Sequence, residues 1–255
     1  MREKLSSIAT TSEPSGTAQT LNPGSDELST ESRRSFLHRS AMVTAAGTAA
    51  VIATSRGGEA ANNSLNVLPR LYPGWNAKNF SSIRQHENDH VAFLQNVLGG
   101  NGFADPGFVG LEQPNALAFA RLSRVFENTG TATYLGAAPL IFNPTNLAAA
   151  ASIALVEARH SGYLNTLLNF HINDSVVAGA ATDESFESPQ SPVATAQAIA
   201  PFLANPALGM ELATAISTTP SPANDIAIFR FALALEYLER DYYNINVPKF
   251  LHVMG

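Results

Sequence analysis

His86-Glu87-Asn88-Asp89-His90 and Val156-Glu157-Ala158-Arg159-His160 are the two stretches that decide the fold of this 255-residue chain. Each contains the motif Glu-x-x-His, and residues three positions apart lie on the same face of an α-helix. Each motif therefore places a carboxylate and an imidazole side by side. A single copy is common on solvated helix faces, but two copies indicate a shared site.

Both motifs lie on apolar stripes with helical spacing. The stripe within residues 81–98, which Gly99 and Gly100 terminate, consists of Ile83, Glu87, His90, Leu94 and Val97. The stripe within residues 146–170 consists of Ala150, Ile153, Glu157, His160, Leu164 and Leu167. We therefore expect two helices whose Glu-x-x-His motifs face the interior.

Two further stretches have the same periodicity, and each places a carboxylate inward. Residues 114–129 have a stripe of Ala116, Ala120, Ser123 and Glu127. Residues 225–244 have a stripe of Phe229, Ala232, Glu236, Glu239 and Tyr243. Because no convincing alternating strand appears, the sequence predicts an all-α fold, a four-helix bundle that the C-terminal helix completes.

The inward carboxylates need partners, since burying an unpaired carboxylate is costly. Two divalent cations would neutralise the four of them, Glu87, Glu127, Glu157 and Glu236. One Glu from each of two helices and a Glu-x-x-His from each of the other two form a known di-metal ligand set of helical bundles. We therefore expect two metal ions with His90 and His160 among the ligands. Iron is preferred and manganese is the second choice, because both accept mixed carboxylate and imidazole donors.

The local sequence carries a resemblance to a known family. Its motifs are His-Val-Ala-Phe-Leu at 90–94, Glu-Asn-Thr-Gly at 127–130, Ala-Thr-Tyr-Leu-Gly-Ala at 132–137, Ala-Ala-Ala-Ala-Ser-Ile at 148–153, Val-Glu-Ala-Arg-His at 156–160 and Phe-Ala-Leu-Ala-Leu-Glu-Tyr-Leu-Glu at 231–239. These motifs are similar to those of the ferritin-like domain proteins that include the desiccation-related proteins. The similarity covers most of residues 75–170 and then residues 224–245.

The resemblance implies a ferritin-like bundle in which each predicted ligand has a role. Glu87 and Glu157 would bridge the two metals, His90 and His160 would bind one metal each, and the terminal ligands would be Glu127 and Glu236. One feature departs from the family, because the Leu-Glu-Tyr-Leu-Glu helix ordinarily opens the domain and here closes the chain. We interpret this as a circular permutation, which a bundle with neighbouring ends tolerates.

The residues around the ligands leave two alternatives open. Glu236 and Glu239 share a stripe, and Glu236 is preferred because Tyr243 follows it by seven residues, where ferritin-like helices often place a supporting tyrosine. Glu239 would then hydrogen-bond a ligand histidine. Residues 86–90 also match the zinc-hydrolase motif His-Glu-x-x-His. That interpretation gives the second Glu-x-x-His no role, so His86 is expected beside the ligands or at the surface. Tyr134 and Tyr163 are expected to be core aromatics.

Composition excludes several function classes. The chain has no Cys, which excludes disulfides, thiolate metal sites and cysteine nucleophiles. Its formal net charge is −6. Residues 1–60 carry six basic and six acidic groups, so the acidity belongs to residues 61–255 and argues against nucleic acid as a partner. The expected partners are metal ions and dioxygen or peroxide, and a second copy of the chain is a further candidate.

Residues 1–60 differ from the rest of the chain. A Ser/Thr/Pro/Gly-rich lead-in without apolar periodicity indicates disorder. Ser32-Arg33-Arg34-Ser35-Phe36-Leu37, followed by the small and apolar residues 41–53, resembles a twin-arginine export signal. The apolar run is too short to span a bilayer. We expect cleavage after Ala53 or near Ala60, and export by the twin-arginine machinery to the periplasm or the outside of the cell.

The remaining residues, 61–255, would form the bundle domain, with residues 171–224 as a crossover or cap. The first function hypothesis is a di-metal oxidase of Fe(II) or a peroxide scavenger in stress protection. The second is a non-catalytic, desiccation-related bundle, and the sequence leaves open whether the protein is an enzyme.

Overall fold

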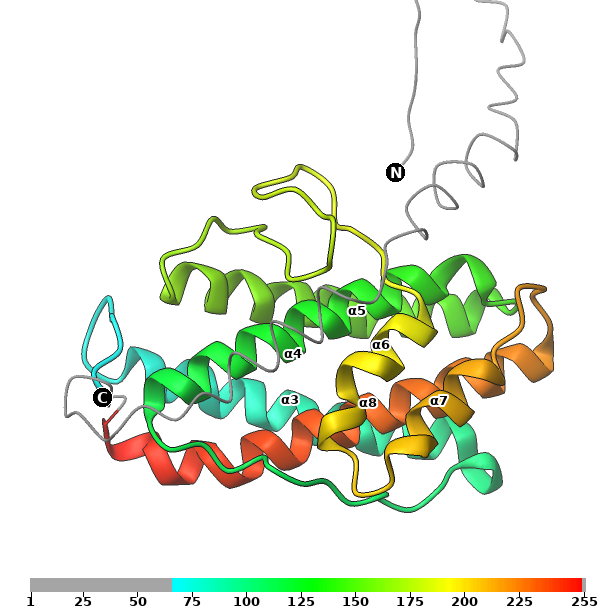
Figure 1. The fold of residues 1–255 in the computed structure, drawn as a ribbon, viewed down its shortest axis with the longest axis horizontal. Helices are drawn as coiled ribbons and strands as arrows, with labels where there is room; N and C mark the ends of the chain where they lie inside the picture. Colours follow the sequence, from blue (N-terminus) through cyan, green and yellow to red (C-terminus); the bar gives the residue numbers. More distant parts are fainter. Residues whose placement is uncertain (1–65, 254–255) are drawn as a thin grey trace, which may run out of the picture.

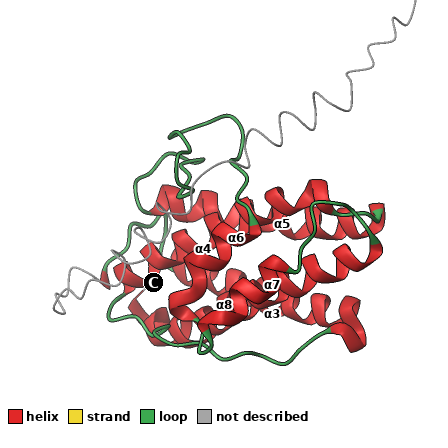
Figure 2. Cartoon of the chain, turned by 45° about the vertical axis from the view of Figure 1, so that its right-hand side comes forward, coloured by secondary structure: helices red, strands yellow, loops and turns green. Residues whose placement is uncertain are grey.

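The computed structural model describes residues 66–253, and in this range the regular elements are all helices (Figure 2). The predicted lead-in, export signal and cleavage region lie outside the described residues. Four long helices dominate: α3 (Trp75–Leu98), α4 (Ala116–Ala137), α5 (Pro144–Leu167) and α8 (Pro222–Phe250). The all-α prediction is confirmed.

The four helices form two antiparallel pairs, α3 with α8 and α4 with α5 (Figure 1). In the first pair, Arg84 of α3 contacts Asn244 of α8. The later residue Gln95 of α3 contacts the earlier residue Tyr237 of α8, so the two helices run in opposite directions. The six residues between α4 and α5 make a tight connection, whereas α5 and α8 are joined by a long crossover. The pairs face each other, and their inner faces meet along the axis of the bundle.

Local sequence chemistry fixes the ends of the helices. The side chains of Asn115, Asn143 and Ser221 accept hydrogen bonds from backbone N–H groups in the first turns of α4, α5 and α8. Gly99 ends α3 with a φ of 51°, a conformation that residues with a Cβ rarely adopt. The predicted glycine stop is therefore correct.

Three helices are longer than the sequence predicted. Helix α3 begins at Trp75, before the predicted start at residue 81. Helix α4 continues from residue 129 to Ala137, and α8 extends in both directions beyond residues 225–244. Residues 122–134 of α4 are buried on every side, so they have no polar face that would mark them as an amphipathic helix. One stripe position was also wrong, because Val97 is 42% exposed while the next residue, Leu98, is buried.

The crossover covers the outer face of α4. It contains two short helices, α6 (Pro192–Ile199) and α7 (Pro206–Thr214). The backbone N–H of Gln190 donates to the carbonyl of Ala132 at 2.8 Å. This close approach needs Gly136, where a Cβ would lie 2.0 Å from the Gln190 carbonyl oxygen.

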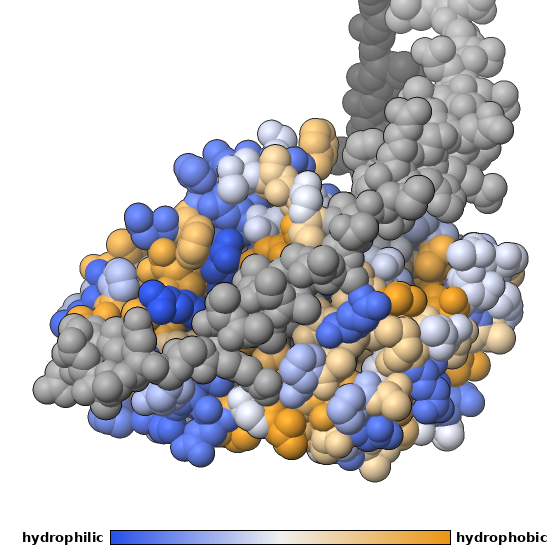
Figure 3. Space-filling view, in the orientation of Figure 1, coloured by the Kyte–Doolittle hydropathy of each residue, from blue (hydrophilic) through white to orange (hydrophobic). Residues whose placement is uncertain are grey.

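The core consists of two apolar clusters at different levels of the bundle. One contains Phe80, Phe119, Phe126 and Tyr242, and the other contains Leu94, Ile153, Phe229 and Leu233. On α3, α4 and α5 the predicted ligands lie between the residues of the two clusters, and on α8 residues of both clusters flank Glu236. The outer surface seen in Figure 3 mixes polar and apolar residues. Among the described residues, every helix is too short or too polar to cross a bilayer.

Candidate metal centre

The six side chains that the sequence singled out come together in the middle of the bundle. Each is 9% exposed or less, and the four carboxylates are at 0%. Helices α3 and α5 each contribute a Glu-x-x-His, and α4 and α8 each contribute one Glu. The residues are Glu87 and His90 on α3, Glu127 on α4, Glu157 and His160 on α5, and Glu236 on α8.

These side chains form two overlapping groups, each able to surround one cation. In both groups the ligand atoms lie within 4.8 Å of one another. The first group comprises Glu87, His90, Glu157 and Glu236, and the second comprises Glu87, Glu127, Glu157 and His160. Glu87 and Glu157 belong to both groups, which is the position that a bridging carboxylate must occupy.

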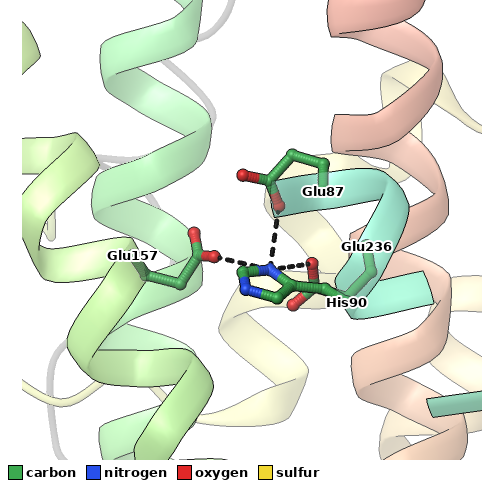
Figure 4. Close-up of side chains that lie close together, drawn as sticks. All are labelled: Glu87, His90, Glu157 and Glu236. Carbon is green, nitrogen blue, oxygen red and sulfur yellow. Dashed lines mark hydrogen bonds and ion pairs between the residues drawn. The ribbon is translucent and has the colours of Figure 1, made fainter. Parts of the chain in front are cut away.

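The first group converges on one nitrogen of His90 (Figure 4). Its Nδ1 atom lies 3.1 Å from Glu87 Oε2, 3.2 Å from Glu157 Oε1 and 3.1 Å from Glu236 Oε2. Three carboxylates from three helices thus point at the same place.

The second group repeats this arrangement around His160. Its Nδ1 atom lies 3.0 Å from Glu127 Oε2 and 3.2 Å from Glu87 Oε1. Both imidazoles therefore direct the same ring nitrogen at carboxylates, as two halves of a pseudo-symmetric site would.

Two buried tyrosines support the terminal carboxylates. Tyr134 donates its hydroxyl hydrogen to Glu236 Oε1 at 2.6 Å, and Tyr243 donates to Glu127 Oε1 at 2.5 Å. Tyr134 lies in the apolar core, as the sequence predicted, and its hydroxyl in addition binds Glu236 on α8. Tyr243 was expected to support Glu236 on its own helix, but it binds Glu127 on α4 instead. The missed indication was a shared spacing, since each tyrosine follows its helix's Glu by seven residues. Tyr163 contacts Trp75 and Phe80, as a core aromatic does.

His86 lies outside both groups. Its Nδ1 atom is 2.8 Å from Nε2 of His160, the ring nitrogen that faces away from the carboxylates. A His-Glu-x-x-His zinc site needs His86 and His90 on one cation. The geometry instead places His86 behind a predicted ligand, where a hydrogen bond orients the ligand ring.

Glu239 is buried beside the site without joining either group. It is 3% exposed. The expected bond between Glu239 and a ligand histidine stays a prediction. Glu239 lies against Gly130 of α4, where an added Cβ would be 3.3 Å from Glu239 Oε1 and 3.3 Å from Glu157 Oε2.

Burial and mutual repulsion shift the pKa values of the acids in the site. Burial and the charge of Glu157 raise the pKa of Glu87 to about 7. Burial and the charge of Glu127 raise the pKa of Glu157 well above its usual value. Burial and the charge of Glu157 do the same to the pKa of Glu239. Four carboxylates and a fifth nearby cannot all be ionised in an apolar interior without compensating positive charge.

The imidazoles supply part of that charge. Burial alone would lower the pKa of His90, but the charge of Glu236 and hydrogen bonds to the carboxylates raise it well above its usual value. The pKa of His160 is raised in the same way, chiefly by Glu127. In return, and despite burial, His90 lowers the pKa of Glu236.

The donor set fits two metal ions. In the described part of the chain, Oε2 of Glu157 is buried without a hydrogen-bond partner, and Oε1 of Glu157 and Oε1 of Glu87 have only the 3.2 Å ion pairs with the two histidines and no hydrogen bond of good geometry. Such orphaned acceptors are rare in native interiors and call for a partner. They belong to the two residues common to both groups, where bridging ligands would use them.

Comparison with known proteins supports a ferritin-like domain. Residues 56–170 match the family model of the ferritin-like domain, a range that includes α3, α4 and α5 and ends before α8. A comparison with curated proteins and a comparison with solved structures each found no match.

Proposed function

We propose that this protein holds two metal ions at a carboxylate-bridged centre, with iron as the first choice and manganese as the second. The observation that carries the proposal is the sharing of Glu87 and Glu157 by two four-residue groups. Two separate mononuclear sites would share no ligand. Glu127 and His160 would complete one coordination shell, and His90 and Glu236 would complete the other.

The choice of metal follows from the donor atoms. Mixed carboxylate and imidazole ligands without sulfur suit iron and manganese. Such a metal pair supplies redox chemistry with dioxygen or peroxide. We therefore propose oxidation of Fe(II) or removal of peroxide, in stress protection, as the reaction class.

The chain's own residues orient the ligands. Tyr134 and Tyr243 each bind one oxygen of a terminal carboxylate and leave the other oxygen directed at the opposing histidine. His86 engages the far nitrogen of His160, which leaves Nδ1 free for the centre. The apolar clusters above and below exclude water and strengthen every electrostatic interaction between them.

Metal analysis of the purified protein is the decisive experiment. We expect two ions per chain after loading with Fe(II) or Mn(II), and fewer than one in a Glu157→Gln variant, because this change replaces a carboxylate of both groups. An exposed carboxylate, Glu112, provides the control substitution Glu112→Gln. A wild-type protein that binds no metal would contradict the proposal.

Consumption assays separate the two function hypotheses. If the loaded protein consumes dioxygen with Fe(II), or consumes peroxide, the catalytic proposal stands. Two bound ions without consumption would favour the non-catalytic, desiccation-related alternative. We further propose that the protein reaches the periplasm or the exterior by twin-arginine export, which the motif at residues 32–37 supports.

A further inference from the structure

The predicted ligands closest to solvent are the two histidines. His90 is 9% exposed and His160 is 5% exposed, whereas the four carboxylates are at 0%. His160 contacts α3 through His86, and His90 contacts α5 through Glu157, so both imidazoles lie on one side of the bundle, between α3 and α5. These two helices pack less closely against each other than α4 and α8 do. An ion that approaches on this histidine side therefore has little protein to displace.

The opposite side of the bundle is covered. Helix α6 packs on α4 and α7 packs on α8, so the crossover lies over the side where these two long helices meet (Figure 1). Apolar clusters fill the bundle above and below the centre. A cation that crossed either cluster would lose its water without gaining other ligands, which is costly. The histidine side instead offers an approach with polar groups along it.

His86 covers the histidine side. It is half-buried, and its ring is nearly parallel to the ring of His160, with 7° between the planes and 5.1 Å between the centroids. When His160 binds a metal through Nδ1, its Nε2 carries a hydrogen atom and donates it to Nδ1 of His86, which is 2.8 Å away. One hydrogen bond thus holds the cover in place. Because the ring is partly exposed, a rotation toward solvent breaks this bond without disturbing the apolar core.

Two exposed charges of opposite sign stand beside this cover. Asp89 follows His86 by three residues and shares its face of α3. Arg159 has the corresponding place on α5, because each of the two residues directly precedes a ligand histidine. A charge at the mouth of a route acts chiefly on the rate at which a charged solute arrives. Asp89 attracts a cation to this place and Arg159 repels it, so the pair reports where ions enter.

We propose that metal ions enter and leave the centre on the histidine side, and that His86 is the gate of this route. The inference rests on the proposed function and adds to it a path and a residue that is no ligand of the centre. The side chain rotates outward to admit an ion and then returns to its hydrogen bond with His160. The contact that orients His160 is thus also the contact that closes the route.

The test measures the rates of metal binding to the full chain, with Co(II) as the probe. Co(II) accepts carboxylate and imidazole ligands, and its visible absorption follows binding in a stopped-flow instrument. Release is measured by mixing the loaded protein with excess chelator. His86→Ala removes the cover, and His86→Phe keeps a ring there that cannot hydrogen-bond. Both variants lose the bond to His160, so a role of His86 in orientation alone predicts the same association rate for both.

We expect His86→Ala to bind Co(II) about tenfold faster than the wild type, the equivalent of one hydrogen bond that no longer has to open. Its release should accelerate even more, because the orientation of His160 is lost as well. His86→Phe should bind no faster than the wild type. Equal association rates in the two variants, or slower binding by His86→Ala than by the wild type, would overturn the gate.

The charged pair locates the route without changing the gate. At low ionic strength we expect Asp89→Asn to lower the association rate about two- to threefold and Arg159→Gln to raise it by a similar factor, and added salt should weaken both effects. The matched control is Glu211→Gln, which removes an exposed negative charge from α7 on the covered side and should leave the rate unchanged. Unchanged rates in both charge variants, or a larger effect of Glu211→Gln, would overturn the route.

Stoichiometry separates this inference from the proposed function. If the wild type binds no Co(II), the function proposed above is wrong and the gate falls with it. If two ions bind per chain but the rates follow the contradicting pattern, the centre stands and only the gate is refuted.

Discussion

Glu236 and Glu127 show how single residues are held at the centre. Each is oriented by a tyrosine from the other's helix, so α4 and α8 exchange one hydrogen bond in each direction. Breaking either bond would leave a buried carboxylate with one oxygen unpaired, a state that costs more than the bond itself contributes. The reciprocal arrangement therefore fixes the position of α4 relative to α8 at the level of the site.

At this scale the sequence was informative because helical spacing is rigid. Glu87 and His90 had to share a face, and so did Glu157 and His160. The contacts between helices were not predictable, since they depend on how the helices are rotated and displaced against each other. The bond from Tyr134 to Glu236 and the closeness of Gly130 to Glu157 were missed for this reason. For the same reason the sequence left open whether His86 lies beside the ligands or at the surface.

The first prediction compares three histidines. His90→Ala and His160→Ala should each lower the metal content to about one ion per chain or less, because each imidazole belongs to one group only. His86→Ala should still reach two ions at saturation, with affinity about 10–100-fold lower because the orienting hydrogen bond to His160 is lost. Metal titration measures both effects. A larger loss of metal in His86→Ala than in His90→Ala would favour a zinc site at residues 86–90.

The second prediction concerns pH and the protein stripped of metal. Burial and Glu157 raise the pKa of Glu87 from 4.5 to about 7, so protonation favours the folded state and this contribution is lost as the pH rises from 4.5 to about 7. The pKa of His90 is also raised, by Glu236 against the effect of burial, and its contribution is lost as the pH rises further above 6.5.

The raised pKa values of Glu87 and His90 both make the folded state less stable as the pH rises. The depressed pKa of Glu236, which His90 causes despite burial, stabilises the fold above 4.5 and adds no slope at higher pH. We therefore expect the Tm of the stripped protein to fall by about 5 °C or more between about pH 5 and about pH 9. Thermal denaturation followed by circular dichroism measures it. A Tm that rises over this interval would contradict the assignment of these shifts.

At the scale of elements, amphipathic periodicity located all four long helices but predicted too early an end for α4. A helix that is covered on one side only has a polar face, and the pattern then marks its length. Helix α4 is covered by α5 and α8 on one side and by α6 on the other. Thr131 and Thr133 donate to carbonyls four residues earlier, so these poor helix formers satisfy their own hydroxyls within the helix.

The third prediction tests the contact between the crossover and α4. Gly136→Ala would place a methyl group 2.0 Å from the Gln190 carbonyl oxygen, and that neighbour is backbone, which cannot simply rotate away. We expect the free energy of unfolding in urea to fall by about 3 kcal/mol. Gly162→Ala, which meets only ordinary contacts, should leave it unchanged or slightly raised. Equal stability of both variants would mean that the crossover does not pack on α4 in solution.

At the scale of the whole molecule, four helices bring together six ligands that are 149 residues apart at the extremes, from Glu87 to Glu236. Antiparallel pairs suffice for this, whatever the order in which the chain visits the helices. The match to the ferritin-like domain ends before α8, the helix that the permutation would have moved. The permutation thus stays a prediction, while the site depends only on which helices face one another.

The last prediction concerns the compartment in which the centre acquires its metal. The intrinsic affinity of carboxylate and imidazole ligands alone favours copper or zinc over iron or manganese. The twin-arginine pathway carries folded proteins, so a bundle that loads its metals inside the cell would leave with the site already filled. Changing Arg33 and Arg34 together to Lys should therefore keep the protein in the cytoplasm, as fractionation would show, with its metal content unchanged. A matched Arg39→Lys variant should be exported normally. Export of the double variant at the wild-type level would contradict the twin-arginine assignment, and zinc or copper in the exported wild type would contradict loading before export.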